Sequence, residues 1–271
     1  MSVQSSPVRV TPEALKRLLR DVKTIMTSPL TDQGIYYHHD SNDILRGLAM
    51  IVGPKDTVYE GGYYLFEINY PPNYPHSPPE FKFYTNDGTA RLHPNLYKSG
   101  KVCLSILNTW RGEGWTSCQT ISSVLITVCS ILCPKPLLNE PGVSSTHRDM
   151  APYEAIVSFK NYDLAIAGML ESGSSHFPLK FECFKPDMQR LFVRNYDMIA
   201  ATVAKRCEEF PKPTTLCTEI YRMSVTIDFS AAAHRLACLA ERFGVGSCQS
   251  SVRRVSNKKI KSESCVSEKI E

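Results

Sequence analysis

The stretch of sequence that decides the fold is HPNLYKSGKVCLSIL, residues 93–107. It places Asn95 eight residues before Cys103, with Gly100 between them. Glycine adopts backbone conformations that other residues avoid, so Gly100 indicates an irregular loop with a close backbone approach. Such a loop would hold Cys103 in a shallow, open groove, although composition alone favours a buried apolar cysteine.

The sequence before this stretch predicts one helix followed by antiparallel strands. Residues 12–26 follow the candidate N-cap Thr11 and carry apolar side chains at three- and four-residue steps, which is typical of an amphipathic helix. Its apolar face consists of Leu15, Leu18, Leu19, Val22 and Met26. Residues 44–52, 62–70 and 81–85 are predicted strands, and the proline-rich segment between the last two must be an irregular crossing. This order indicates an α+β domain in which the helix packs against a sheet.

The sequence after the stretch predicts a buried helix and a helical C-terminal extension. Beyond the loop-like residues 86–118, residues 119–133 are apolar on most faces, which indicates a central buried helix. Three further helices are predicted at 150–171, 184–210 and 229–243. We therefore expect a flexible N-terminus, a core domain, a helical extension and a disordered tail, over residues 1–11, 12–170, 171–244 and 245–271.

Composition and charge exclude several classes of protein. The chain has 271 residues, of which 42% are hydrophobic and 21% charged, which is typical of a globular protein. The net charge of +4 is too mild to indicate a nucleic-acid-binding protein. No leader-like apolar segment opens the sequence, and no uncharged apolar run approaches the roughly 18–20 residues that span a bilayer. We expect a soluble monomer of the cytosol or nucleus that binds neither nucleic acid nor membrane.

The 10 cysteines predict free thiols rather than a metal or redox site. No two of them are separated by only two residues, which argues against a zinc ribbon or a thioredoxin-like site. Cys129 and Cys133 are four residues apart on a predicted helix and so share a face. No second pair of ligands follows them at zinc-like spacing, so core packing is the favoured interpretation.

In combination, these motifs resemble the ubiquitin-conjugating enzyme family. The resemblance covers about residues 13–142 and rests on His93-Pro94-Asn95 in register with Cys103, on YEGGYYLFEINYPPNYPHSPPEF at 59–81, and on Trp115 with the helix after it. The stretch KVCLSILNTW and the later tetrapeptide NEPG are closest to the Z-type subgroup. The resemblance implies a UBC fold: an N-terminal helix on a four-stranded antiparallel meander sheet, with a central buried helix and a C-terminal helical extension.

The same resemblance implies roles for single residues. Cys103 would carry ubiquitin or a ubiquitin-like modifier as a thioester, received from an activating enzyme and passed to a substrate lysine or a ligase. Asn95 would stabilise the developing oxyanion or hold the loop, and His93 would be structural. Glu140 falls where many members carry an aspartate that helps to deprotonate the incoming lysine, although a surface carboxylate fits it nearly as well. Ser105 stands where many members carry a second acid, which argues against a relay of several carboxylates.

Partner-binding residues follow from the resemblance in the same way. The basic face of the first helix would meet the activating enzyme and ligases through Lys16, Arg17 and Arg20, although any amphipathic helix has a solvated charged face. His76 and Ser117 fall at ligase-contacting positions where other residues are commoner, which weakens the prediction of ordinary RING-ligase pairing. The sequence has no phosphate-binding glycine loop, so we expect no bound cofactor and assign ATP consumption to the activating enzyme.

Two other classes of function stay open at this point. A catalytically inactive, ubiquitin-binding relative would keep the fold but usually lacks the active cysteine, whereas Cys103 is present with Asn95 in register. A cysteine hydrolase would pair Cys103 with a positioned imidazole. No spacing identifies such an imidazole, but His93 lies on the same loop.

Overall fold

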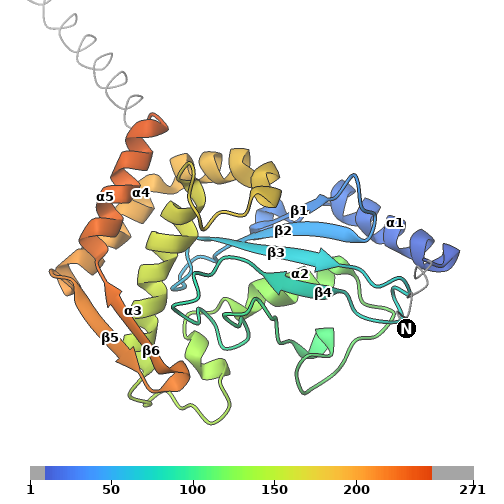
Figure 1. Ribbon diagram of the computed structural model, residues 1–271, viewed down its shortest axis with the longest axis horizontal. Helices are drawn as coiled ribbons and strands as arrows, with labels where there is room; N and C mark the ends of the chain where they lie inside the picture. The colour runs from blue at the N-terminus through green and yellow to red at the C-terminus, as the bar shows by residue number, and fades with distance from the viewer. Residues whose placement is uncertain (1–9, 246–271) are drawn as a thin grey trace, which may run out of the picture.

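A four-stranded antiparallel sheet forms the centre of the fold (Figure 1). The computed structural model describes residues 10–245, so the predicted disordered tail apart from Val245, and most of the predicted flexible N-terminus, lie outside the described residues. The strands pair in chain order, which confirms the predicted meander. Their bounds are Ile35–His39 (β1), Arg46–Val52 (β2), Tyr63–Asn69 (β3) and Glu80–Phe83 (β4).

Strand β1 is the element of this sheet that the sequence pattern did not locate. It pairs only with β2, with Ile35 opposite Ile51, and forms one edge of the sheet. Ile35 is the one fully buried residue of its sequence IYYHH, so the hydrophobic alternation that marks a strand is nearly absent. Strands β2 and β3 lie inside the sheet and bury consecutive residues, which explains why their apolar sequences were recognisable.

Helix α1 (Pro12–Thr27) begins where the sequence predicts. The Thr11 hydroxyl accepts a hydrogen bond from the N–H of Ala14 at 3.1 Å, which makes Thr11 the N-cap. Proline at the first helical position needs no N–H partner and so favours the same start. The fully buried side chains of the helix are Ala14, Leu18, Asp21 and Ile25.

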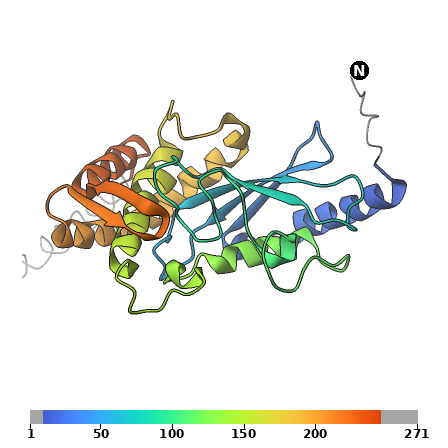
Figure 2. The same ribbon diagram turned by 60° about the horizontal axis from the view of Figure 1, so that its bottom comes forward.

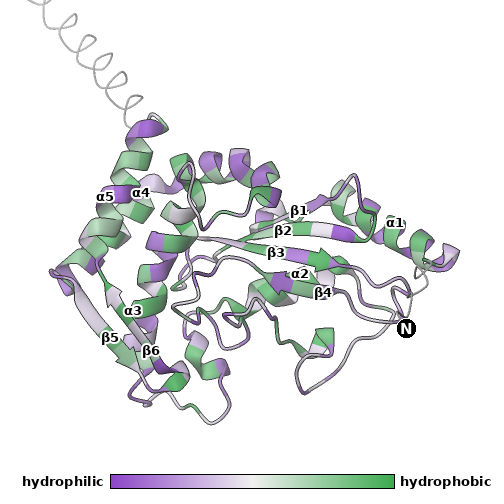
Figure 3. Ribbon diagram, viewed as in Figure 1, coloured by the Kyte–Doolittle hydropathy of each residue, from purple (hydrophilic) through white to green (hydrophobic). Residues whose placement is uncertain are grey.

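The apolar face predicted for α1 is only partly buried, which corrects the prediction. Three of its members are exposed by 37%, 49% and 55%: Leu15, Leu19 and Met26. Asp21 points inward instead, where it accepts a hydrogen bond from the Tyr74 hydroxyl at 2.7 Å and pairs with Arg17 at 2.9 Å. Because this polar pair occupies the inner side, the helix turns two leucines and Met26 toward solvent. Figure 3 shows hydrophobic and hydrophilic segments alternating along α1.

Helix α2 (Ile121–Ile131) is the predicted central helix. Its first turn is closed by a reciprocal capping box, in which the N–H of Ser123 donates to the Thr120 hydroxyl at 3.3 Å and the N–H of Thr120 donates to the Ser123 hydroxyl at 3.0 Å. Its buried side chains are Ile121, Val124, Leu125 and Val128. Figure 2 shows α1 and α2 on the same side of the sheet, where they contact each other and cover its inner face.

The C-terminal extension contains a β-hairpin as well as helices, as Figure 1 shows. Its helices are α4 (Lys185–Glu209) and α5 (Phe229–Arg242), and before it α3 (Met150–Lys160) continues as a π-helix (η4, Asn161–Gly168) at the end of the predicted core domain. The hairpin consists of β5 (Thr214–Thr218) and β6 (Met223–Ile227). The sequence analysis predicted helices alone here, although MSVTI in β6 alternates buried apolar and exposed polar residues with the period of two that marks a strand.

The extension shares one hydrophobic core with the sheet. This core runs without interruption from Leu18 of α1 to Ala240 of α5. Polar contacts reinforce the junction: Lys160 pairs with Asp87 at 2.6 Å, and the Tyr63 hydroxyl donates to a backbone carbonyl of α4 at 2.8 Å. Docked in this way, the extension can place its hairpin against the loops at one end of the sheet. Within residues 10–245, none of the helices combines the length and the apolar character of a membrane span.

Candidate active site

The predicted active-site loop is closed by two hydrogen bonds between Asn95 and Cys103. The N–H of Cys103 donates to the Asn95 carbonyl at 2.9 Å, and the side-chain amide of Asn95 donates to the Cys103 carbonyl at 2.6 Å. The eight-residue spacing in the sequence is therefore that of a narrow loop with paired ends. An asparagine amide has two N–H groups, and this bond uses one of them.

His93 lies against this loop as a buried, neutral side chain. It is fully buried, and its Nδ1 accepts a hydrogen bond from the N–H of Asn95 at 2.9 Å. Burial lowers the pKa of His93 to about 3, against the opposing effect of a backbone hydrogen bond with Ile131. An imidazole so enclosed supports the backbone of Asn95 and has no surface to offer a substrate.

The burial of His93 predicts a loss of stability in acid. The unfolded chain protonates His93 below its ordinary pKa of 6.5, whereas the folded chain does so only near 3. The contribution of neutral His93 to the free energy of unfolding is complete above pH 6.5 and should be lost progressively as the pH falls toward 3. At pH 5 the loss should be about 2 kcal/mol. Urea denaturation of the wild type and of His93→Gln at pH 7.5 and pH 5 measures this. Equal pH dependence in the two proteins would contradict the assignment.

Gly100 allows the loop to pass close to the edge of the sheet. Its backbone has φ +88°, and its carbonyl accepts a hydrogen bond from the N–H of Phe83 at 2.8 Å. A Cβ at this position would lie 2.8 Å from the Phe83 carbonyl oxygen. The sequence prediction that Gly100 permits a close backbone approach is confirmed by these contacts.

Gly100→Ala should therefore cost more stability than an ordinary glycine substitution. We expect the free energy of unfolding to fall by about 3 kcal/mol, because the left-handed backbone and the clash with Phe83 both oppose the methyl group. Gly88→Ala is the matched control, since Gly88 has φ +75° but no atom lies within 4 Å of the place that the added methyl group would take. It should lose only about 1 kcal/mol. Equal losses in urea denaturation would show that the approach to Phe83 is not tight.

Cys103 is 2% exposed, which corrects the prediction of an open groove. The loop after it is drawn back by Thr109, whose hydroxyl accepts a hydrogen bond from the N–H of Leu104 and donates to the carbonyl of Val102, each at 2.9 Å. This clasp folds residues 104–109 against the backbone that flanks the cysteine. We expect this loop to move when the thiol reacts, because a protein tail must reach the sulfur.

Glu140 binds a residue that the sequence pattern did not single out. The Tyr221 hydroxyl donates a hydrogen bond to Glu140 Oε2. Tyr221 lies in the turn between β5 and β6, and Figures 1 and 2 both show this turn beside the segment that leads into α3. The two residues are 81 positions apart, and the sequence pattern left residues 211–228, between two predicted helices, without an assigned element.

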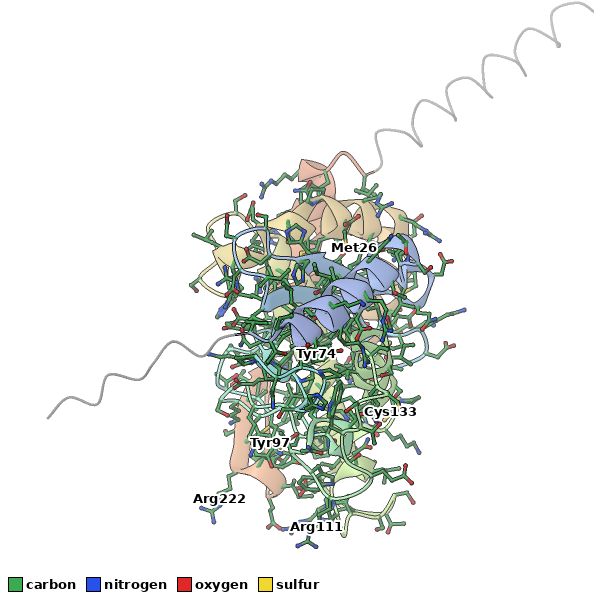
Figure 4. The ribbon with its side chains drawn as sticks, turned by 90° about the vertical axis from the view of Figure 1, so that its right-hand side faces the viewer. Met26, Tyr74, Tyr97, Arg111, Cys133 and Arg222 are labelled. Atoms are coloured by element: carbon green, nitrogen blue, oxygen red, sulfur yellow. The ribbon has the colours of Figure 1, made fainter. Side chains whose placement is uncertain are left out.

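Arg91 connects the same hairpin to the active-site loop. Its guanidinium carbon lies 3.7 Å from the centre of the Tyr97 ring and 4.2 Å from that of Tyr221. It also donates a hydrogen bond to the carbonyl of Pro94, next to Asn95. In Figure 4 the labelled Tyr97 and the hairpin residue Arg222 lie toward the same end of the molecule. The hairpin therefore contacts both sides of the site.

A hollow of about 590 Å³ lies between the loop that follows Cys103 and the segment that follows Glu140. It is lined by Asn108, Thr109, Trp110, Arg111 and Pro141. The loop that follows Cys103 bounds it on one side, and the residue after Glu140 bounds it on the other. The Trp110 side chain is 44% exposed, so an aromatic surface faces the opening.

The residues predicted to bind partners gather around α1, which Figure 1 shows at the opposite end of the molecule from the hairpin. Arg17 donates to the Ser117 carbonyl at 2.5 Å and pairs with a buried aspartate, so its charge is used within the chain. Lys16, His76 and Ser117 are exposed, and the Arg20 side chain is 71% exposed. These exposed residues are available to a partner. Arg17 instead holds the backbone of Ser117 against α1.

No group of three His, Cys, Asp or Glu side chains that could hold a metal ion occurs in the part of the chain that the structure describes. Cys133 lies beyond the end of α2 at Ile131, so the prediction that it shares a helix face with Cys129 is wrong. Both cysteines are half-buried, and Cys129 packs against the hydrophobic core.

Comparison with known proteins identifies relatives of this chain. The family model described as "Ubiquitin-conjugating enzyme" matches residues 17–160. Ubiquitin-conjugating enzyme E2 Z of Homo sapiens is 38% identical over 192 residues, which cover 70% of this chain and 52% of that protein. E2 Z of Xenopus tropicalis is 36% identical over 201 residues, which cover 73% of this chain and 62% of that protein. The dual E2 ubiquitin-conjugating enzyme/E3 ubiquitin-protein ligase BIRC6 of Mus musculus is 34% identical over 236 residues, which cover 80% of this chain and 4% of that protein.

A solved structure of human ubiquitin-conjugating enzyme E2 G1 is 34% identical and covers 45% of this chain and 96% of that chain, with a TM-score of 0.39. The chain spans 52% of the human E2 Z sequence and 62% of the Xenopus one. The E2 Z relatives confirm the predicted resemblance to the Z-type subgroup. Because the family model matches more than half of its residues, the chain belongs to the ubiquitin-conjugating enzyme family.

Proposed function

We propose that this chain accepts ubiquitin from an activating enzyme as a thioester on Cys103 and transfers it to a substrate lysine or to a ligase. In charging, the Cys103 thiolate attacks the activating enzyme's thioester, and the cysteine of that enzyme leaves as a thiolate. In transfer, a lysine amine attacks the new thioester, an amide bond forms, and Cys103 leaves. The paired loop carries this proposal, because it fixes one cysteine out of 10 next to the Asn95 amide.

Asn95 and Glu140 assist the transfer in this proposal. Asn95 fixes the backbone of Cys103, and its second amide N–H stabilises the oxyanion that forms as the amine attacks. The lysine ammonium must first lose a proton: partial desolvation lowers its pKa, and a nearby carboxylate accepts the proton. Glu140 supplies that carboxylate, and the half-buried Ser105 has no acidic group to share the work.

The proposed partners follow from the same reaction. The activating enzyme and a ligase would contact the exposed Lys16 and Arg20 and the neighbouring segments of His76 and Ser117. The activating enzyme would consume the ATP, so the chain itself would need no cofactor. We propose that it acts as a monomer in the cytosol or nucleus on ubiquitin or a ubiquitin-like modifier.

A charging assay separates this proposal from the two alternatives. The full chain is incubated with activating enzyme, ATP and ubiquitin and run on a nonreducing gel, where an adduct that thiol destroys supports the carrier. No adduct with any of a panel of activating enzymes and ubiquitin-like modifiers would favour the inactive binding module. Cleavage of a ubiquitin-derived ester without activating enzyme would favour the hydrolase, against which the buried, neutral His93 argues.

A further inference from the structure

The turn of the β5–β6 hairpin holds a conformation that needs support from its surroundings. Tyr221 has φ +65° and Arg222 has φ +48°, both in the left-handed region that residues other than glycine avoid. The turn is anchored by the buried Asp149, whose Oδ2 accepts the N–H of Ile220 at 2.7 Å. Arg148 and Glu219, the neighbours of these two residues, form an ion pair at the surface. The body of the protein therefore fixes the turn in a specific place, and strain of this kind is commonest at functional sites.

The ring of Tyr221 is packed between the core and the active-site loop. On one side it meets the fully buried Tyr153, with ring centroids 6.1 Å apart. On the other side lies the Arg91 guanidinium, 4.2 Å from the ring centre, which in turn donates to the carbonyl of Pro94. Because the ring cannot swing freely between these contacts, the position of its hydroxyl is fixed.

That hydroxyl donates to Glu140 Oε2. Burial, followed by the hydrogen bond to Glu140, raises the pKa of Tyr221, so the phenol stays protonated and remains a donor. Glu140 itself is half-buried at the end of a short helical turn, Pro136–Asn139, and a glutamate there has several side-chain torsions to fix. A bond to one carboxylate oxygen restricts these torsions and leaves the other oxygen to accept a proton.

We propose that Tyr221 is a positioning residue that holds the Glu140 carboxylate for deprotonation of the incoming lysine. This inference rests on the proposed function, in which Glu140 serves as the acidic helper. The lysine ammonium gives one proton to the free oxygen of Glu140, and the amine attacks the thioester carbonyl. Cys103 leaves as a thiolate, and the nitrogen gives its second proton to that thiolate as the amide forms. The hairpin of the extension thereby becomes part of the transfer machinery, and charging of Cys103 does not depend on it.

Tyr221→Phe in the full chain tests this, because it removes the hydroxyl and keeps the ring between Arg91 and Tyr153. Ubiquitin is first loaded onto the protein, and its discharge to free lysine is then followed in a single turnover over a range of lysine concentrations. The maximal discharge rate should fall about tenfold, with little change in the lysine concentration at half-maximal rate. Charging should stay within about twofold of the wild type. Tyr196→Phe, a half-buried tyrosine of α4 that packs on Phe192, is the matched control and should discharge normally.

A double-mutant cycle with Glu140→Gln distinguishes positioning from general support of the fold. Glu140→Gln should slow discharge strongly, and adding Tyr221→Phe to it should slow discharge by less than about twofold more, because the group being positioned is already gone. Thermal melting of each variant checks that all remain folded.

Several outcomes would overturn the inference. One is that Tyr221→Phe discharges normally although Glu140→Gln discharges slowly. Another is that Tyr221→Phe still slows discharge tenfold when Glu140→Gln is already present. Normal discharge by Glu140→Gln would remove the acid that Tyr221 is inferred to hold. Each of these leaves the Cys103 thioester intact, whereas a wild-type chain that never charges would overturn the proposed function together with the inference.

Discussion

Cys103→Ser should convert the ubiquitin adduct from a thiol-sensitive thioester into an ester that survives reducing agent. A serine oxygen at this position can receive the modifier, but it is a much poorer leaving group than a thiolate. Discharge to free lysine should therefore fall by on the order of 10³-fold or more, because the bond to be broken is now an oxygen ester. Adduct formation on reducing and nonreducing gels, followed by a lysine chase, measures both effects.

The control for this substitution is another cysteine of the same chain. Cys183→Ser changes an exposed thiol in the extension, outside the active-site loop, and should charge and discharge like the wild type. If Cys103→Ser instead gave an adduct as sensitive to thiol as the wild-type adduct, the modifier would be carried on a different cysteine.

Asn95→Ala should damage both the stability of the loop and the transfer step. The carbonyl of Cys103 would lose its donor at 2.6 Å, and leaving that acceptor unsatisfied should lower the free energy of unfolding by about 1–3 kcal/mol. Loss of the amide beside the oxyanion, together with a shifted cysteine, should reduce discharge to lysine by about 10²-fold. Urea denaturation and single-turnover discharge of the same protein separate the two effects.

The relative size of these two effects shows what Asn95 does. A large loss of stability with normal discharge would restrict Asn95 to holding the loop, and slow discharge with normal stability would restrict it to the oxyanion. Asn195→Ala, which changes a half-buried asparagine of α4, is the control for loss of an asparagine as such. Normal stability and normal discharge in Asn95→Ala would contradict both roles.

The parts of the structure that the sequence predicted well are those specified by neighbouring residues. The start of α1 follows from Thr11 and Pro12, and α2 lies within the single apolar stretch 119–133. The loop between Asn95 and Cys103 is equally local, because its closing hydrogen bonds join residues eight apart. Such features depend on short stretches of chain, so their residue types and spacing identify them directly.

The parts that the sequence did not predict depend on distant residues or on weak patterns. The contact between Tyr221 and Glu140 requires a hairpin turn 81 residues downstream, in a segment that the sequence pattern left unassigned between two predicted helices. The Asp21 side chain points inward because it accepts a hydrogen bond from Tyr74 of the proline-rich crossing. The amphipathic pattern of α1 does not indicate that such a partner exists. The burial of Cys103 reflects the Thr109 clasp, whose hydrogen bonds cannot be inferred from composition.

The most direct test of the central claim is to locate the thioester on the chain. Wild type, Cys103→Ala and Cys183→Ala are each incubated with activating enzyme, ATP and ubiquitin, and the products are compared on nonreducing gels. We expect a thiol-sensitive adduct with wild type and with Cys183→Ala, and none with Cys103→Ala. An undiminished thiol-sensitive adduct on a folded Cys103→Ala protein would contradict the assignment of Cys103 as the ubiquitin carrier.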